Sequence, residues 1–298
     1  MALRGPALAG IARRQDSPEK FDKNDPTATV AQKTMANTTV LITGANTGLG
    51  FETARDLARS GARIILVCRC QQKARHAIKT IAESVPGSEG MLQFETADLS
   101  LLSSIKALVE RLKSAEMKIN VLINNAAILP PPQRSLTSEG LEVTFATNYL
   151  GPFYLTGLLM ESDLPLNRSR YPSVDQLYAN TKLMLNMWTC WLARNVDEFE
   201  VKIYGVEPGF VDSKFTRSHS WLSFLWNFHV SLNSLEASFG HSRIVNLATE
   251  RVNHATGIYH RHVGVPHHMA EQVWDYGSQQ RMIDASWKII EQITSTWR

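Results

Sequence analysis

The stretch VLITGANTGLGFETARDLARSGARIILVCR, residues 40–69, decides the fold. A short apolar strand at 40–43 leads into a glycine-rich turn, after which apolar residues recur at helical spacing. The apolar run at 63–68 predicts a second buried strand, so the stretch has the order of a βαβ unit. Gly44, Gly48 and Gly50 let the backbone of the turn approach a pyrophosphate, which free N–H groups at the helix start can hold. Glycines alone would also suit any other strand-to-helix turn, so the rest of the sequence has to decide.

The pattern continues along the chain. Apolar stripes predict a helix after each of the first three strands, and further strands are predicted at 92–96 and 120–128. This alternation predicts an α/β fold with a doubly wound parallel sheet, as one domain at residues 35–298. The stripes consist of Phe51, Ala54, Leu57 and Ala58, then of Ala74, Ala77, Ile78 and Ile81, and then of Ile105, Leu108, Val109 and Leu112.

Charged side chains at two strand ends indicate which nucleotide cofactor the chain would bind. Sites that prefer NAD often place an acid after the second strand, whereas this chain has Arg69 there, followed by Lys73 and Arg75. A cation favours the 2′-phosphate of NADP, so we expect NADP(H) rather than NAD(H) as the cofactor, with a merely solvated strand end as the alternative. Asp98, after the third strand, is expected either at the adenine edge or as the cap of the following helix.

Composition limits the class of protein. The chain has 298 residues, of which 44% are hydrophobic and 20% charged, so a packed globular core is expected. The net charge is +3 without a long Lys/Arg block, which gives no reason to expect a nucleic-acid partner. Three cysteines, Cys68, Cys70 and Cys190, cannot form a closed disulfide framework, and a reducing compartment is expected.

Two segments bear on location. Residues 1–34 lack apolar periodicity and predict a disordered tail. Three arginines precede its first acid, a composition compatible with a mitochondrial targeting peptide, although a plain solvated tail or an upstream start ahead of Met35 explains it as well. The apolar stretch at 221–232 is shorter than the roughly 18 residues that a spanning helix needs, so no transmembrane span is expected. We therefore predict a cytoplasmic protein.

Three motifs in order give a specific resemblance. TGANTGLG, NNAA and YANTK, at these separations, resemble the short-chain dehydrogenase/reductase (SDR) family, in particular its retinol-dehydrogenase-like branch. The similarity runs from about Val40 to the end of the chain. It implies a Rossmann-type fold and an NAD(P)-dependent oxidoreductase.

The resemblance also implies a set of site residues. Asn148, Tyr178 and Lys182 would be catalytic, with Asn148 steadying Lys182 through a water molecule. Ser213 stands near the family's usual threonine, and no metal site is implied. The cofactor would be bound by Gly44, Asn46, Gly48, Leu49 and Gly50 at its phosphates, by Arg69, Asp98 and Leu99 at the adenosine, and by Asn124, Asn125, Ala126, Tyr178, Lys182, Pro208, Gly209 and Val211 on the nicotinamide side.

The chemistry of Tyr178 and Lys182 can be stated without the family. Residues four apart share one helix face, and an ammonium beside a phenol should lower the phenol's pKa. Tyr178 could then exchange a proton with the substrate oxygen while hydride moves at the nicotinamide. A Tyr and a Lys at this spacing can equally be a solvated helix face, and the preceding dinucleotide half is what favours catalysis.

One expected element is missing from the sequence. In the family, a fifth strand between Asn148 and Tyr178 supplies a serine to the substrate oxygen, but residues 162–177 contain no apolar run of four and carry two prolines. Ser162, Ser169 and Ser173 are poor substitutes because nothing fixes their positions. We predict an irregular connection from Ser162 to Leu177, with no serine hydroxyl beside that of Tyr178. A shortened transcript or a misjoined gene model would produce such a gap, and a catalytically silent nucleotide-binding or interaction protein is the alternative function.

The second half suggests the substrate. Aromatic residues at 215–228 stand where the family keeps a mobile substrate cover, which implies a small lipophilic substrate such as a retinoid, steroid or other lipid carbonyl; core packing or peripheral membrane contact is the alternative. The four histidines in HRHVGVPHHM (260–269) lack the spacing of a metal site; they are His260, His262, His267 and His268. A homodimer through the helices that bear Asn148 and Tyr178 is possible by resemblance. The last helix should dock on the core through Trp274, Ile283, Trp287, Ile290 and Ile293.

Overall fold

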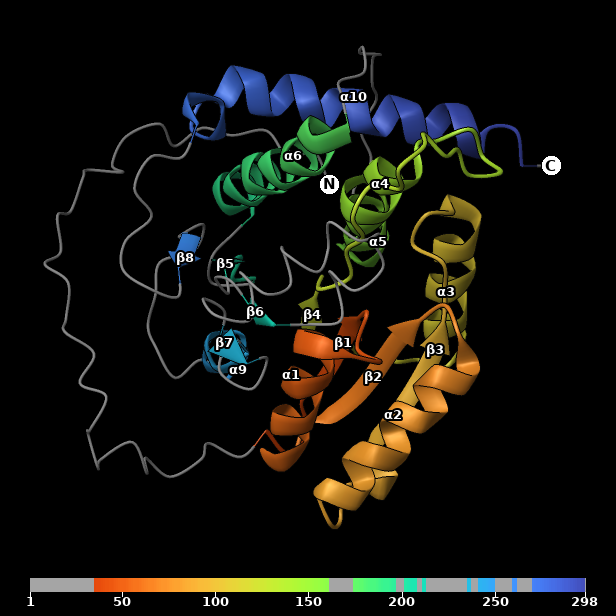
Figure 1. Cartoon of the computed structure of the whole chain (residues 1–298), viewed down its shortest axis with the longest axis vertical. Coiled ribbons are helices and arrows are strands. Elements are labelled where there is room, and N and C mark those ends of the chain that lie inside the picture. Colours follow the sequence, from red (N-terminus) through yellow and green to blue (C-terminus); the bar gives the residue numbers. More distant parts are fainter. Residues whose placement is uncertain are drawn as a thin grey trace, which may run out of the picture.

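A four-stranded parallel sheet forms the centre of the protein (Figure 1). The computed structural model describes residues 35–160, 174–196, 201–207, 211–212, 235–236, 241–249, 259–261 and 270–297. The strand order is β3-β2-β1-β4, which follows the order of a dinucleotide-binding sheet as far as its fourth strand. The strands are β1 (Thr39–Thr43), β2 (Arg63–Cys68), β3 (Leu92–Thr96) and β4 (Val121–Ile123).

Helices cover both faces of the sheet because successive side chains of a strand point to opposite faces. Val40, Ile42 and Ile64 pack against the face covered by α1 (Gly48–Arg59) and α2 (Gln71–Ser84). Leu41 and Ile65 pack against the other face, where α3 (Leu102–Ser114) lies. The predicted apolar stripes of these helices are confirmed, with Phe51 and Ile78 partly buried and the other residues of the stripes fully buried. The predicted α/β fold with a doubly wound parallel sheet is therefore confirmed.

A second helical group packs beside α3. It contains α4 (Val143–Phe145), a five-residue π-helix η3 (Ala146–Leu150), α5 (Gly151–Met160), α6 (Val174–Asn195) and α10 (Tyr276–Thr294). Aromatic rings join these helices: the ring centroid of Phe153 lies 5.5 Å from that of Trp188 on α6 and 5.1 Å from that of Trp287 on α10. Figure 1 shows α10 running across the top of α6 and α4.

The remaining elements are short. They are the 3₁₀ turns η2 (Glu89–Met91) and η5 (Glu271–Val273), α9 (Ser242–Ala248), and two separate two-stranded parallel pairs. One pair joins β5 (Gly205–Glu207) to β8 (Tyr259–Arg261), and the other joins β6 (Val211–Asp212) to β7 (Leu235–Glu236).

Several predicted elements need correction. The strand predicted at 120–128 is only Val121–Ile123, because the small and amide residues after it turn toward β1 and α5. Within residues 201–207 only Gly205–Glu207 form a strand, β5, and among the described strands β5 pairs with β8 and not with β4. Within the described residues β4 pairs with β1 alone and is therefore an edge of the sheet.

Two further corrections concern helix ends. The irregular connection predicted up to Leu177 is wrong for residues 174–177, which begin α6, while Ser162, Ser169 and Ser173 lie outside the described residues. Trp274 precedes α10 and is 53% exposed, so it does not dock on the core as predicted. The helix begins after Asp275, whose carboxylate accepts a hydrogen bond from the Ser278 amide at 2.7 Å.

Candidate functional site

The glycine turn has the backbone that its sequence predicted. Gly44 and Gly48 have φ angles of +66° and +61°, a region that favours glycine. A Cβ on Gly50 would lie 2.4 Å from Nδ2 of Asn125, so only glycine fits where the start of α1 meets the end of β4. Asn46 lies in the turn and Leu49 in the first turn of α1. That first turn contains no acidic residue and no side-chain cap, which leaves its N–H groups suited to an anion.

Thr43 and Asn125 clamp two strand ends together. The hydroxyl of Thr43, at the end of β1, accepts hydrogen bonds from the amides of Asn125 at 3.0 Å and Ala126 at 3.1 Å. In return, Nδ2 of Asn125 donates to the carbonyl of Thr43 at 2.8 Å. Asn124 points elsewhere, donating to Thr156 Oγ1 of α5 at 3.1 Å. Of the two amides predicted on the nicotinamide side, Asn125 is the one that borders the glycine turn, and sequence reasoning missed Thr43.

Arg69 and Asp98 are brought together at the ends of β2 and β3. Their charged groups lie 4.0 Å apart, and the Arg69 side chain is 65% exposed, so it is free to reorient toward solvent or a ligand. Asp98 accepts hydrogen bonds from the amide and hydroxyl of Ser100 and does not cap α3. The cap of α3 is Glu139, from a distant loop, whose carboxylate accepts from the amides of Leu102 at 2.7 Å and Ser103 at 2.9 Å. The alternative role of Asp98 as a helix cap was therefore wrong.

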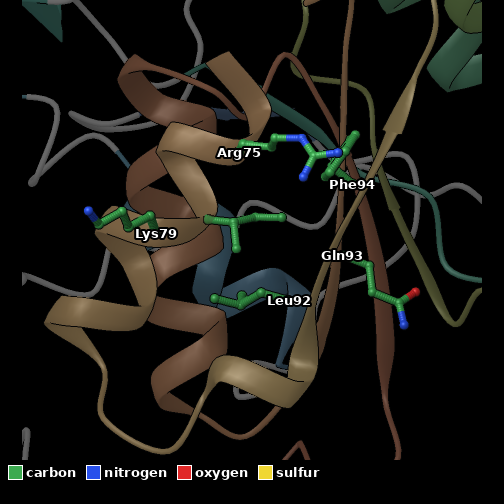
Figure 2. A pocket seen from close by; sticks show the side chains of 6 residues that line it. Arg75, Lys79, Leu92, Gln93 and Phe94 are labelled. Atoms are coloured by element: carbon green, nitrogen blue, oxygen red, sulfur yellow. The ribbon is translucent and has the colours of Figure 1, made fainter. Parts of the chain in front are cut away.

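Arg75 faces a different place from Arg69. Its guanidinium lies 5.3 Å from the ring centroid of Phe94, across a pocket of about 560 Å³ between α2 and β3. Figure 2 shows Arg75 reaching from α2 to Phe94, with Gln93 pointing away on the other side of the strand. This open pocket lies at the edge of the sheet, away from the glycine turn. The strand ends and the first turn of α1, and not this pocket, are the candidate nucleotide site.

Leu99 is a core residue as well as a predicted neighbour of the adenosine. It is 5% exposed, and a Cβ on Gly151 would lie 2.1 Å from its carbonyl oxygen. This close approach fixes the start of α5 against the loop that carries Asp98.

Asn148 lies in the π-helix and is 1% exposed. Its Oδ1 accepts from the amide of Ile128 at 2.8 Å, and its Nδ2 donates to the carbonyl of Ile128 at 2.9 Å and to Thr181 Oγ1 at 3.4 Å. Thr181 in turn donates to the carbonyl of Tyr178 at 2.8 Å. The side chain of Asn148 is thus engaged by the loop after β4 and by α6. Its contact with Lys182 through a water molecule stays a prediction. Sequence reasoning missed Thr181, because a single hydroxyl carries no periodic signal.

Tyr178 and Lys182 share one face of α6, as predicted. The ammonium of Lys182 lies 5.6 Å from the centroid of the Tyr178 ring. Burial raises the pKa of Tyr178 above its ordinary value and lowers the pKa of Lys182 below its own. The expectation that the ammonium lowers the pKa of the phenol is wrong in this structure, because Lys182 lies over the ring and desolvation dominates.

Helix α10 covers the outer faces of α5 and α6. Nε1 of Trp191 donates to Gln280 at 2.9 Å, and Arg194 donates to Gln279 Oε1 at 3.1 Å and to the carbonyl of Trp274 at 3.2 Å. The homodimer through the helices that bear Asn148 and Tyr178 stays a prediction.

Several predicted residues lie outside the described part of the chain. These are Pro208, Gly209, Ser213, the aromatic segment at 215–228 and most of the histidine-rich segment, while Val211 is described only as part of β6. Among the described residues, no group of histidine, cysteine and acidic side chains is arranged to hold a metal ion. None of the described helices is long and apolar enough to cross a membrane.

Comparisons with known proteins agree with this geometry. A family model described as short chain dehydrogenase matches residues 38–170. Retinol dehydrogenase 12 of Mus musculus is 36% identical over 210 residues, which cover 63% of this chain and 66% of that protein. Retinol dehydrogenase 11 of Homo sapiens is 34% identical, with 63% and 65% covered. The match thus spans slightly less than two thirds of the length of these relatives.

Solved structures share the architecture. The crystal structure of an uncharacterised protein from Mycobacterium paratuberculosis aligns with a TM-score of 0.65 and 27% identity, covering 88% of this chain and 95% of that one. Levodione reductase aligns with a TM-score of 0.62 and 20% identity, covering 76% and 96%, which supports the fold alone. Over residues 38–170 the chain is thus similar to the short chain dehydrogenases, and the curated relatives that it resembles are retinol dehydrogenases.

Proposed function

We propose that this chain transfers a hydride between NADP(H) and a lipophilic alcohol or carbonyl compound. The observation that carries the proposal is the arrangement of α6: Tyr178 and Lys182 share one face, and Thr181 bonds that helix to Asn148. Asn148 is bonded in turn to Ile128 in the loop after β4, whose first residues border the glycine turn. A proton-transfer group and a dinucleotide turn are thereby parts of one connected site.

The residues of the turn fit a dinucleotide. The open first turn of α1 suits the phosphates, and Gly44 and Gly50 allow the close backbone approach. Arg69 is exposed beside Asp98, so its guanidinium can leave that weak contact for a ribose 2′-phosphate, which would make NADP(H) the preferred cofactor. When bound, NADP(H) supplies or accepts the hydride.

Tyr178 would handle the proton. Its raised pKa keeps the phenol protonated at neutral pH, which suits proton donation to a carbonyl oxygen during reduction. In the opposite direction the phenol must first lose its proton, so oxidation of an alcohol should accelerate as the pH rises. Lys182 would bind the ribose hydroxyls and, once its ammonium approaches the phenol oxygen, stabilise the phenolate.

Retinoids are the first substrates to test, because the relatives with about a third of their residues identical are named retinol dehydrogenases. Steroid and other lipid carbonyls are the next class. The test incubates the full chain with NADPH and a panel of these carbonyls, beside a Tyr178→Phe variant. Turnover that depends on the phenol supports the proposal, and turnover no greater than that of the variant rejects it.

A second function has its own observation in favour. β4 is an edge of the sheet within the described residues, and β5 pairs with β8 and not with β4, so the part of the sheet that should carry the serine differs from a complete dinucleotide fold. This favours a protein that binds the nucleotide without turnover. Calorimetric titration with NADPH separates the two: binding without product formation supports the second function, and binding with product formation removes it.

A further inference from the structure

Asn148 and Tyr149 are neighbours in the π-helix η3, and their side chains point to different helices. The side chain of Asn148 reaches α6 through Thr181, while that of Tyr149 reaches α10. A π-helical turn is wider than an α-helical one, and it is uncommon and found mostly at functional sites. Contacts from outside the turn are therefore needed to hold it.

The contact with α10 is a buried hydrogen bond. The hydroxyl oxygens of Tyr149 and Ser286 lie 2.7 Å apart, although the residues are 137 positions apart in the chain. Ser286 donates its own proton to the carbonyl of Met282 at 2.9 Å, so Tyr149 is the donor and Ser286 the acceptor. Both side chains are almost fully buried, at 0% and 1% exposed. Burial also raises the pKa of Tyr149, which keeps its hydroxyl protonated as a donor.

The contact with α6 continues to the proposed catalytic turn. Asn148 donates to Thr181 at 3.4 Å, and Thr181 donates to the carbonyl of Tyr178 at 2.8 Å. The π-helix is thus bonded on one side to α10 and on the other to the residue that would exchange the proton. The rings of Phe153 and Trp287 pack α10 against α5 directly beside this path, with their centroids 5.1 Å apart.

We propose that Ser286 of α10 is a positioning residue for the Tyr178–Lys182 pair, because its hydrogen bond to Tyr149 fixes the π-helix that aligns Asn148 and Thr181 with the catalytic turn of α6. The inference rests on the proposed oxidoreductase function. In this proposal α10 positions the catalytic residues as well as packing on the core. A residue that affects turnover then lies in the last 30 residues of the chain, far in sequence from the glycine turn and from YANTK.

The kinetic test compares Ser286→Ala, Tyr149→Phe and the double variant with the wild type, each corrected for its folded fraction. Loss of the bond should lower kcat about tenfold to a hundredfold, as expected for a small misplacement of reacting groups, with KM for NADPH changed less than about twofold. The double variant should be no slower than the slower single variant, since both remove the same bond. Ser286→Thr, which keeps a hydroxyl, should restore turnover. Ser295→Ala on an exposed position after the same helix is the matched control and should behave as wild type.

If Ser286→Ala lowers stability but leaves kcat of the folded fraction unchanged, the hydrogen bond serves packing only and the proposal is overturned. If the wild type shows no turnover, the side-chain amide of Asn148 still reports the geometry by NMR. The proposal requires that Ser286→Ala shift this resonance and accelerate its hydrogen exchange while Ser295→Ala does neither. An unchanged Asn148 signal in Ser286→Ala rejects the positioning role independently of whether the protein is an active enzyme.

Discussion

Gly50→Ala should damage both the fold and the nucleotide site. The added Cβ would lie 2.4 Å from Nδ2 of Asn125 and 2.9 Å from the carbonyl oxygen of Gly44. Asn125 cannot yield freely, because its Nδ2 donates to the carbonyl of Thr43 at 2.8 Å and also contacts that of Gly44.

Two costs follow from this geometry. Breaking the Asn125 bond leaves partly buried polar groups unsatisfied, at about 1–3 kcal/mol. Moving the backbone around Gly44 adds an overpacking cost of about 1–3 kcal/mol, while the better helix propensity of alanine returns at most about 1 kcal/mol. We expect a net loss of about 1–6 kcal/mol in the free energy of unfolding.

Urea unfolding measures this loss, and calorimetric titration measures the affinity for NADPH, which should fall at least about tenfold. Gly90→Ala is the control, because a Cβ there meets nothing within 4 Å, and it should change stability by less than about 0.5 kcal/mol. A Gly50→Ala protein that is as stable as Gly90→Ala and binds NADPH as tightly as wild type would refute the account of the clamp between β1, α1 and β4.

Three further predictions test other parts of the site. Arg69→Asp should lower the preference for NADPH over NADH about tenfold to a hundredfold, measured as the ratio of the two dissociation constants, because a phosphate-binding cation becomes an acid; an unchanged ratio would remove Arg69 from the cofactor site. Asp56→Asn should lower the melting temperature at pH 7 by about 2–4 °C, since Asp56 bonds His241 at 2.5 Å between α1 and α9. Burial opposes ionisation of Asp56, but His241 and Arg59 outweigh it and hold the pKa of Asp56 below its ordinary 3.8. The contribution of Asp56 is therefore complete above about pH 4 and is lost as the pH falls through the lowered pKa; a stability difference from wild type that does not shrink as the pH is lowered below 4 would contradict this. Because burial raises the pKa of Tyr178, carbonyl reduction should be level from pH 6 to 8 while alcohol oxidation rises over the same range, and an oxidation rate that falls with pH would exclude Tyr178 as the base.

Much of the first half of the fold could be predicted because its signals are local. The stripe of Ala54, Leu57 and Ala58 fixes one helix face, and the apolar run at 63–68 fixes a fully buried strand from its second residue onward. The tight turn after β1 could also be predicted from its glycines, since Gly44 and Gly48 take the positive φ angles that the turn requires.

The contacts that organise the candidate site could not be predicted in this way. Side-chain hydrogen bonds to residues far away in the chain or on a neighbouring turn carry these contacts, and none of the residues that make them interrupts or extends a periodic pattern. The residues are Thr43, Glu139, Thr181 and Ser286. Trp274 was misplaced for the opposite reason, because its spacing to Trp287 is compatible with one helix. The signal that corrects it is Asp275, three residues before Ser278, which is the spacing of a helix N-cap.

The sequence also could not predict whether the pKa of Tyr178 is raised or lowered. Spacing places Lys182 on the same helix face but does not say whether its ammonium lies beside the phenol oxygen or over the ring. Burial of both groups, which depends on the helices packed around α6, decides the direction.

The most direct measurement follows the hydride itself. NADPH deuterated at the transferring carbon is incubated with retinal and the wild-type chain, and the alcohol product is analysed by mass spectrometry, beside Tyr178→Phe. We predict that the wild type forms an alcohol one mass unit heavier, in amounts equal to the NADPH consumed, and that the variant forms almost none. A wild-type protein that binds NADPH but yields no deuterated alcohol from retinal or from any carbonyl of the panel would contradict the proposed oxidoreductase.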